Sequence, residues 1–225
     1  MIKPILLKPA FEDDDFDLFF LVRHARAPSF KTKAIILLHG VGSNEQDLFD
    51  MAEQFPDDFL VIAPRGPLTL QNGRYAWYEV DFSTGKPVFN FEQEKQSRAL
   101  LIDFISKLKN QYHVDELYLG GFSQGAIMSY TIGLTRPYLV KGILALSGRI
   151  LEEIKPTIQK TNLLQQLRVF IGHGDKDGTL PVVYAHEAKV FLEELGVQLS
   201  YHEYEMGHQV IGSEIQDFVN WLKQG

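Results

Sequence analysis

A serine lies between two glycines in the stretch GFSQG at residues 121–125. The apolar run ELYLGGF leads into it, and the small and apolar residues AIMSYTIG follow it. This order predicts a strand, a sharp turn and a helix, the setting in which a serine hydroxyl is presented as a nucleophile. The motif alone is a weak signal, because glycine and serine are common and an ordinary glycine-rich turn has the same pattern. The strand-to-helix context favours a nucleophile at Ser123.

A serine hydroxyl is unreactive at neutral pH without a base, so the chain must also supply a histidine. When the nucleophile occupies such a turn, the acid follows it in the chain and the histidine comes last. His208 fits this order, in EMGHQVIGSE between the last predicted strand and the last predicted helix. The other six histidines precede the serine or the acid-bearing loop, or fall inside a predicted helix or strand. His208 is therefore the predicted base.

The acid is expected in the loop HGDKDGTLP, which follows a predicted strand at 168–174. Its task is to hold the imidazole in the productive tautomer and to stabilise its protonated form. Asp175 and Asp177 both lie in this loop, and their spacing alone does not separate them. The other aspartate has the ordinary role of a turn or helix-capping residue.

Cleavage of an acyl group also requires N–H donors for the oxyanion that forms on the carbonyl. One donor is the main-chain N–H after the nucleophile, at Gln124, where the positive end of a helix also favours negative charge. The second is expected in the turn HGVG at residues 39–42, directly after a predicted strand. Its candidate is the main-chain N–H of Val41.

Strands and helices alternate along the chain, which predicts a mostly parallel central sheet with helices on both faces. No repeat, low-complexity linker or composition break interrupts this order, so residues 1–225 are predicted to form a single α/β domain. The strands are expected at 17–25, 34–40, 59–65, 116–122, 142–148, 168–174 and 198–206, and the helices at 44–55, 92–111, 182–196 and 212–224, with short helical elements at 125–135 and around 152–166.

The segment 66–91 lies outside this alternation and is long, turn-rich and aromatic. Loops of that length in a folded domain are usually functional. We expect it to form a substrate groove beside Trp77, Tyr75 and Phe89, although a small satellite core under a loop would have the same composition. No insertion is large enough to form a cap domain, so the groove is expected to be open.

The composition excludes several classes of function. The net charge of −7 disfavours nucleic acid or an anionic membrane as a partner, and the absence of cysteine excludes disulfides and thiol catalysis. The N-terminus lacks the apolar core of a signal peptide, and no segment is long and apolar enough to span a bilayer. We therefore expect a cytoplasmic protein with no metal or cofactor. Exposed aromatic residues near the groove would suit a homodimer.

Five motifs together resemble those of the bacterial carboxylesterase/phospholipase family, relatives of the acyl-protein thioesterases. They are LLHGVGSNEQDL, APRGP, GGFSQGA, HGDKDGTLP and MGH, and the resemblance covers essentially the whole chain. It implies an α/β-hydrolase fold without a large cap, and a serine hydrolase that cleaves carboxylic esters through an acyl-enzyme on Ser123. The family's H-G-x-x-D pattern selects Asp177 as the acid. Val41 stands where the family commonly has leucine, which leaves the main-chain donor unchanged.

The resemblance implies substrates ranging from short and medium acyl esters to lysophospholipids and acyl thioesters. Three other interpretations stay open. A serine peptidase can share this fold, and so can a binding protein that has lost its catalytic residues. A metal-dependent hydrolase would use the ligands in HGDKD, but the chain lacks an H-x-H-x-D-H or H-E-x-x-H cluster.

Overall fold

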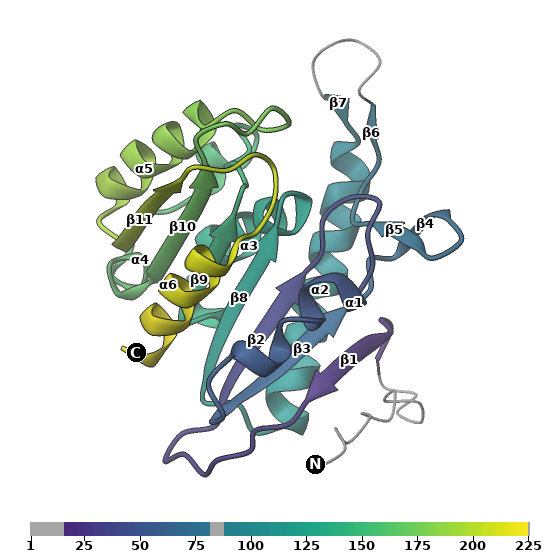
Figure 1. Cartoon of the computed structure of the whole chain (residues 1–225), viewed down its shortest axis with the longest axis vertical. Helices are drawn as coiled ribbons and strands as arrows, with labels where there is room; N and C mark the ends of the chain where they lie inside the picture. The colour runs from purple at the N-terminus through teal and green to yellow at the C-terminus, as the bar shows by residue number, and fades with distance from the viewer. Residues whose placement is uncertain (1–15, 82–87, 225) are drawn as a thin grey trace.

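A computed structural model describes residues 16–81 and 88–224 of the chain. Its centre is a seven-stranded sheet in the order β1-β3-β2-β8-β9-β10-β11 (Figure 1). Neighbouring strands run parallel except for β1, which pairs antiparallel with β3 at one edge. The mostly parallel sheet predicted from the sequence is thus confirmed. The strands are β1 (Phe20–Arg23), β2 (Lys33–Leu38), β3 (Phe59–Pro64), β8 (Glu116–Phe122), β9 (Gly142–Leu146), β10 (Arg168–Gly174) and β11 (Gln198–Tyr204).

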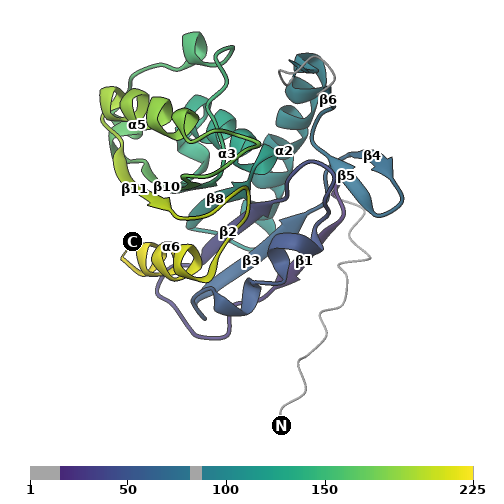
Figure 2. The same ribbon diagram turned by 45° about the horizontal axis from the view of Figure 1, so that its top comes forward.

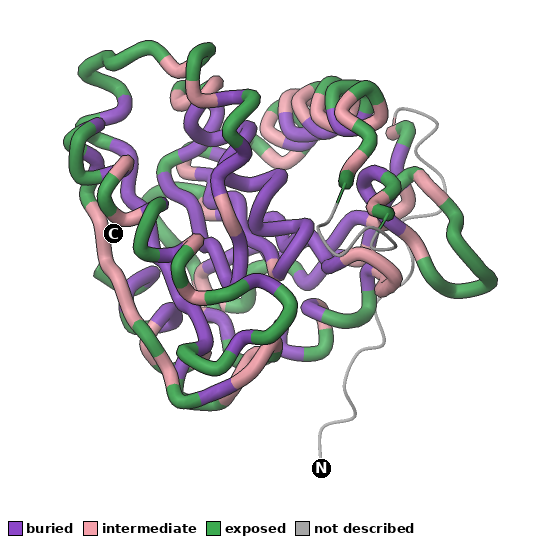
Figure 3. Tube along the Cα trace, turned by 90° about the horizontal axis from the view of Figure 1, so that it is seen from above, coloured by how far each residue is buried: buried purple, intermediate pink, exposed green. Residues whose placement is uncertain are grey.

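Helices cover both faces of this sheet, with α2, α3 and α5 on one side and α1 and α6 on the other (Figure 2). Strand β2 shows how the sequence produces this arrangement. Ile36 and Leu38 face the first group of helices, and the alternate residues Ile35 and Leu37 face the second. Buried residues therefore follow the inner strands continuously and form the centre of the molecule (Figure 3). The helices are α1 (Gln46–Phe49), α2 (Phe91–Gln111), α3 (Gln124–Thr135), α4 (Asn162–Gln166), α5 (Val183–Leu195) and α6 (Gly212–Lys223).

The predicted helix at 44–55 is shorter than expected, and the short elements expected around 152–166 are a 3-10 turn and a short helix. The pattern at 44–55 forms α1 and then a 3-10 turn at Ala52–Gln54. The pattern at 152–166 forms a 3-10 turn at Lys155–Thr157 and then α4. Pro156 lies inside that second stretch and cannot donate the hydrogen bond that a continuous helix requires.

The aromatic segment 66–91 folds into two small hairpins beside the sheet (Figure 1). β4 (Leu68–Gln71) pairs with β5 (Arg74–Ala76), and β6 (Val80–Asp81) pairs with β7 (Val88–Phe89). Residues 82–87 of the segment lie outside the described residues. The first hairpin is exposed at its tip, whereas the chain at 76–78 is buried. Within the described ranges, no helix has both the length and the apolar character needed to cross a bilayer.

Candidate active site

The turn between β8 and α3 holds Ser123 in a backbone conformation that side chains rarely adopt. Its φ is 54° and its ψ is −116°, well outside the ordinary regions for a residue with a Cβ. The glycines of the motif make the turn possible by their small size. A Cβ on Gly125 would lie 1.9 Å from the carbonyl oxygen of Leu38, and one on Gly121 would lie 2.5 Å from the carbonyl carbon of Gly125. The sequence GFSQG therefore presents the serine at the carboxyl end of the central strand β8.

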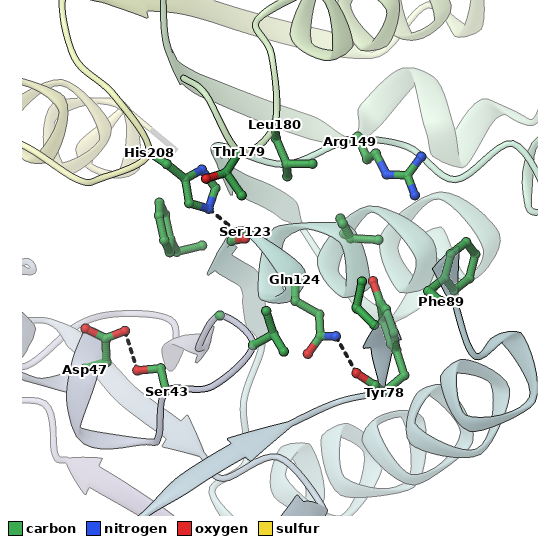
Figure 4. A pocket seen from close by; sticks show the side chains of 15 residues that line it. Ser43, Asp47, Tyr78, Phe89, Ser123, Gln124, Arg149, Thr179, Leu180 and His208 are labelled. Atoms are coloured by element: carbon green, nitrogen blue, oxygen red, sulfur yellow. Dashed lines mark hydrogen bonds between the residues drawn. The ribbon is translucent and has the colours of Figure 1, made fainter. Parts of the chain in front are cut away.

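His208 lies beside this serine, on the loop between β11 and α6 (Figure 4). Its Nε2 is 2.9 Å from the Ser123 hydroxyl oxygen, and its Nδ1 is 2.7 Å from Oδ2 of Asp177. A carboxylate can only accept, so Nδ1 carries the proton and Nε2 is free to accept the hydroxyl hydrogen. The phenyl ring of Phe122 packs against the imidazole at 4.7 Å between centroids. This arrangement can take a proton from the serine.

The environment of Asp177 keeps this carboxyl group ionised. Burial alone would raise its pKa, but the hydrogen bond from His208 and the main-chain N–H groups of Leu180 and Thr179 outweigh burial and hold the pKa below its usual value. These two N–H groups donate to Oδ1 over 2.8 and 2.9 Å. Asp175 is exposed on the same loop. Of the two candidate acids, the structure therefore places Asp177 at His208.

His173 is a supporting residue that sequence reasoning did not assign. It is fully buried, and its Nε2 donates to the carbonyl oxygen of Leu180 over 2.7 Å. Burial lowers the pKa of this imidazole, so it is neutral near pH 7. It fastens the loop that carries Asp177 to β10. Its position four residues before the acid was the available signal, but the sequence alone does not show that its side chain points into that loop.

The turn at 39–42 brings Val41 to the same cavity as Gln124. Two contacts of the imidazole of His39 fix this turn, since Nδ1 donates to the Gly40 carbonyl over 2.8 Å and Nε2 accepts from the Gly66 N–H over 2.9 Å. Burial lowers the pKa of His39, consistent with a neutral ring in this role. Among the described residues, no main-chain hydrogen bond uses the N–H of Val41 or Gln124. Both donors are therefore available to a ligand.

Three aromatic residues were expected beside the groove, and the structure corrects two of them. Phe89 lines the cavity, as does Tyr78, which the sequence reasoning missed. Trp77 is fully buried instead, and its indole N–H donates to the His39 carbonyl over 3.0 Å. The ring of Tyr75 lies 4.5 Å from the Arg65 guanidinium, and neither Tyr75 nor Trp77 is part of the cavity wall. A large ring with one N–H is most stable when it is buried with a partner, which explains the position of Trp77.

The cavity has a volume of about 270 Å³ and opens beside Ser123 (Figure 4). The side chain of Gln124 connects the nucleophile turn to the cavity wall. Its Oε1 accepts from the main-chain N–H of Trp77 over 2.8 Å, and its Nε2 donates to the main-chain carbonyl of Tyr78 over 2.7 Å. The walls are mostly apolar and carry few charges. The residues that line them include Val41, Asp47, Tyr78, Val80, Phe89, Ile127, Arg149 and Leu180.

The side chains of the loop HGDKD, which a metal-dependent hydrolase would use as ligands, have other partners in the structure. His173 contacts a main-chain carbonyl and Asp177 contacts His208. Across residues 16–81 and 88–224, no three histidine, aspartate or glutamate side chains are grouped so as to hold a metal ion.

Comparison with known proteins identifies the family. A family model described as phospholipase/carboxylesterase matches residues 23–224. The chain belongs to this family. It is a hydrolase of the carboxylesterase and thioesterase type with the α/β-hydrolase fold, as the resemblance implied.

Its relatives include both kinds of enzyme. An acyl-protein thioesterase 1 from Kluyveromyces lactis is 32% identical over 221 residues, which cover 90% of this chain and 96% of that protein. The crystal structure of esterase PE8 has a TM-score of 0.78 and 26% identity, covering 92% of this chain and 98% of PE8. A carboxylesterase from Bacillus cereus has the same TM-score at 24% identity, covering 92% and 94%, and this likeness shows the fold.

Proposed function

We propose that this phospholipase/carboxylesterase family member hydrolyses carboxylic esters with short to medium acyl groups through an acyl-enzyme on Ser123. The observation that carries the proposal is the continuous chain of contacts from Ser123 through His208 to Asp177, with distances of 2.9 and 2.7 Å. A binding protein that had lost catalysis would have no need to keep all three groups in this geometry. The strained serine backbone supports the same conclusion, since such strain persists where function requires it.

The mechanism follows from the positions of these groups. His208 takes the hydroxyl proton as Ser123 attacks the ester carbonyl, and Asp177 stabilises the imidazolium that forms. The main-chain N–H groups of Val41 and Gln124 hold the oxyanion, with a contribution on the order of 10²–10³ in rate for each donor. His208 then protonates the leaving alcohol. Water repeats these steps on the acyl-enzyme and releases the acid.

The cavity supports a small or flexible substrate. Its volume of about 270 Å³ lies near the lower end of ordinary ligand pockets, and apolar side chains such as Val80, Ile127 and Leu180 suit a hydrocarbon chain. A second candidate is an acyl thioester, which the same machinery would cleave. It is favoured by the acyl-protein thioesterase from Kluyveromyces lactis, because that relative matches nearly the whole chain. Lysophospholipids are a third substrate class, and a peptidase would need the same site to accept an amide.

The test is hydrolysis of 4-nitrophenyl esters from acetyl to palmitoyl by the wild type and by Ser123→Ala. Ser213→Ala is the matched control, because Ser213 is an exposed serine on α6 outside the cavity. We expect activity that is highest for short and medium chains, absent in Ser123→Ala and unchanged in the control. An acyl-thiocholine series under the same conditions compares thioesters with esters. A folded wild type without activity on any ester or thioester would refute the proposal.

A homodimer and a cytoplasmic location stay predictions from the sequence. Size-exclusion chromatography with light scattering of the full chain measures the first directly.

A further inference from the structure

Arg149 is a cation in the wall of the cavity that the proposed mechanism does not use. It follows β9 directly, at the carboxyl end of the sheet, where ligands of open α/β folds bind. The chain reaches this position through Ser147, which has a φ of 48° and is fully buried. A buried non-glycine residue in the left-handed region is strained, so the surrounding fold determines where the chain leaves β9. The backbone that carries Arg149 is therefore held in one position by the surrounding fold.

The guanidinium of Arg149 is held by rings and not by a carboxylate. It lies 5.4 Å from the centroid of Tyr184 on α5 and 5.9 Å from that of Phe89 on β7. Among the residues that the structure describes, no carboxylate, carbonyl or hydroxyl is bonded to it. Ring contacts orient a guanidinium while leaving its in-plane N–H groups free for an oxyanion.

Other arginines of the chain show the contrast. Arg65 forms two hydrogen bonds with the carboxylate of Glu45. Arg168 donates to the Tyr118 hydroxyl over 3.0 Å and to a main-chain carbonyl over 2.6 Å. These two guanidinium groups have hydrogen-bond partners within the fold, whereas Arg149 lines the cavity and contacts only aromatic rings among the described residues.

The charges of the cavity are also separated in space. Asp47 and Arg149 lie on opposite sides of Ser123 (Figure 4). Asp47 accepts from the hydroxyl of Ser43 over 2.7 Å, on the side of the turn that carries Val41. A bound anion would be repelled on that side and attracted on the other. Most of the other lining side chains are apolar or aromatic, including Ile127, Leu180 and Phe89.

We propose that Arg149 binds an oxyanion, a carboxylate or a phosphate, that the ester substrate carries at a distance from the scissile bond. The enzyme would then select esters with an anionic end over neutral esters of the same length. A planar guanidinium with free donors binds either oxyanion through paired N–H bonds. The proposal rests on the proposed esterase function, which it refines by naming the charge of the substrate.

The first experiment compares mono-4-nitrophenyl adipate with 4-nitrophenyl hexanoate, two esters with six-carbon acyl groups that differ in a terminal carboxylate. The quantity measured is the ratio of their kcat/KM values. We expect the wild type to prefer the adipate ester, and Arg149→Gln to reduce the ratio by roughly 10- to 100-fold, mainly through KM. Arg149→Lys should recover part of the ratio, because it retains the charge but not the fork. Arg74→Gln is the matched control, since Arg74 is exposed on β5 outside the cavity.

A second substrate set places the anion on the alcohol. Butyl butyrate, the butyryl ester of 4-hydroxybutanoate and that of 4-hydroxybutyl phosphate are compared by pH-stat titration. The series that loses its preference in Arg149→Gln shows whether the acyl or the alcohol side of the ester carries the anion. Within the second series, the larger loss for the carboxylate ester or for the phosphate ester shows which oxyanion Arg149 binds.

The outcomes separate this inference from the proposed function. Hydrolysis of the neutral esters that disappears in Ser123→Ala, with the same anionic-to-neutral ratio in the wild type and Arg149→Gln, would overturn the role of Arg149 and leave the esterase proposal intact. Failure to hydrolyse any of the esters would overturn both. If Arg149→Gln does not fold, the salt dependence of the wild-type enzyme tests the inference instead. The preference of the wild type for the anionic ester should weaken at high salt, and the absence of any preference at low salt would refute the inference.

Discussion

Replacement of Asp177 by asparagine tests the catalytic geometry with almost no change in shape. An asparagine oxygen at the position of Oδ1 still accepts from the main-chain N–H groups of Thr179 and Leu180. Its NH₂ group then takes the position of Oδ2, 2.7 Å from Nδ1 of His208. Two donors cannot share that contact, so Nδ1 must give up its hydrogen and Nε2 must carry it instead. In this tautomer His208 points an N–H group at Ser123 and cannot act as its base.

The size of the effect follows from these contacts. To restore the productive tautomer, the amide must flip and lose both main-chain hydrogen bonds, each contributing about 1 kcal/mol. This costs about 2–3 kcal/mol, which corresponds to roughly 10²-fold in rate. The asparagine also lacks the negative charge that stabilises the imidazolium in the transition state, which lowers the rate further. We therefore expect kcat to fall about 10³- to 10⁴-fold, similar to the loss measured for this change in a serine protease.

The assay is steady-state hydrolysis of 4-nitrophenyl butyrate, with thermal unfolding followed by circular dichroism. Asp175→Asn is the matched control, because Asp175 is the exposed aspartate of the same loop. It should leave kcat within about twofold. If Asp177→Asn retained more than a tenth of the activity while Asp175→Asn lost most of it, Asp177 would not be the acid. A loss of activity that accompanied unfolding would instead be assigned to stability, so both measurements are needed.

Two further predictions concern stability. Gly125→Ala should lower the unfolding temperature by about 10 °C or prevent folding, because its Cβ would overlap the Leu38 carbonyl. Gly178→Ala is the control and should change the unfolding temperature little, because no atom lies within 4 Å of the new Cβ. Equal melting curves for the two variants would contradict the tight turn. Glu214 is buried, and burial raises its pKa to about 8. Its protonated form therefore contributes its full share to the free energy of unfolding below about pH 4.5, and this contribution is lost as the pH rises to about 8. In denaturant titrations, the free energy of unfolding of Glu214→Gln should therefore rise relative to that of the wild type by about 1 kcal/mol per pH unit in that window. A difference between the two free energies that does not change with pH would refute the buried ionisation.

Most strands of the sheet were predictable because the inner strands are buried on both faces. In such a strand the apolar run is continuous, as in AIILL on β2, and its length distinguishes it from a helix. The predicted strands at 116–122 and 168–174 have the bounds of β8 and β10, and the bounds of the other strands agree to within three residues. The short elements were less predictable. Around 152–166 the sequence indicated short helical elements without their bounds, and in the structure they are a 3-10 turn that contains Pro156 and then α4.

The catalytic candidates were predictable from chain order and local context, because a nucleophile turn, an acid loop and a late histidine each have recognisable neighbours. The choice between Asp175 and Asp177 did not follow from spacing, since it depends on which side chain points inward; only the resemblance to the family's H-G-x-x-D pattern selected Asp177. The prediction for the aromatic segment 66–91 was wrong in part for a related reason. Its composition shows that it contains many rings but not which of them face the core. For Trp77 the inward position depends on the hydrogen bond from its indole N–H to the turn at 39–42.

Gln124 explains why the cavity wall and the nucleophile belong to one structural unit. Its main-chain N–H faces the cavity, while its side chain binds the main chain of two consecutive residues, Trp77 and Tyr78. Because a buried amide that lost these partners would be costly, the chain at 77–78 must stay in register with the nucleophile turn. That register directs Trp77 inward to the turn that carries Val41, and it leaves Tyr78 at the cavity. One glutamine thus couples the backbone strain at the serine, the proposed oxyanion donors and the shape of the substrate pocket, although in the sequence it is only the residue after the nucleophile.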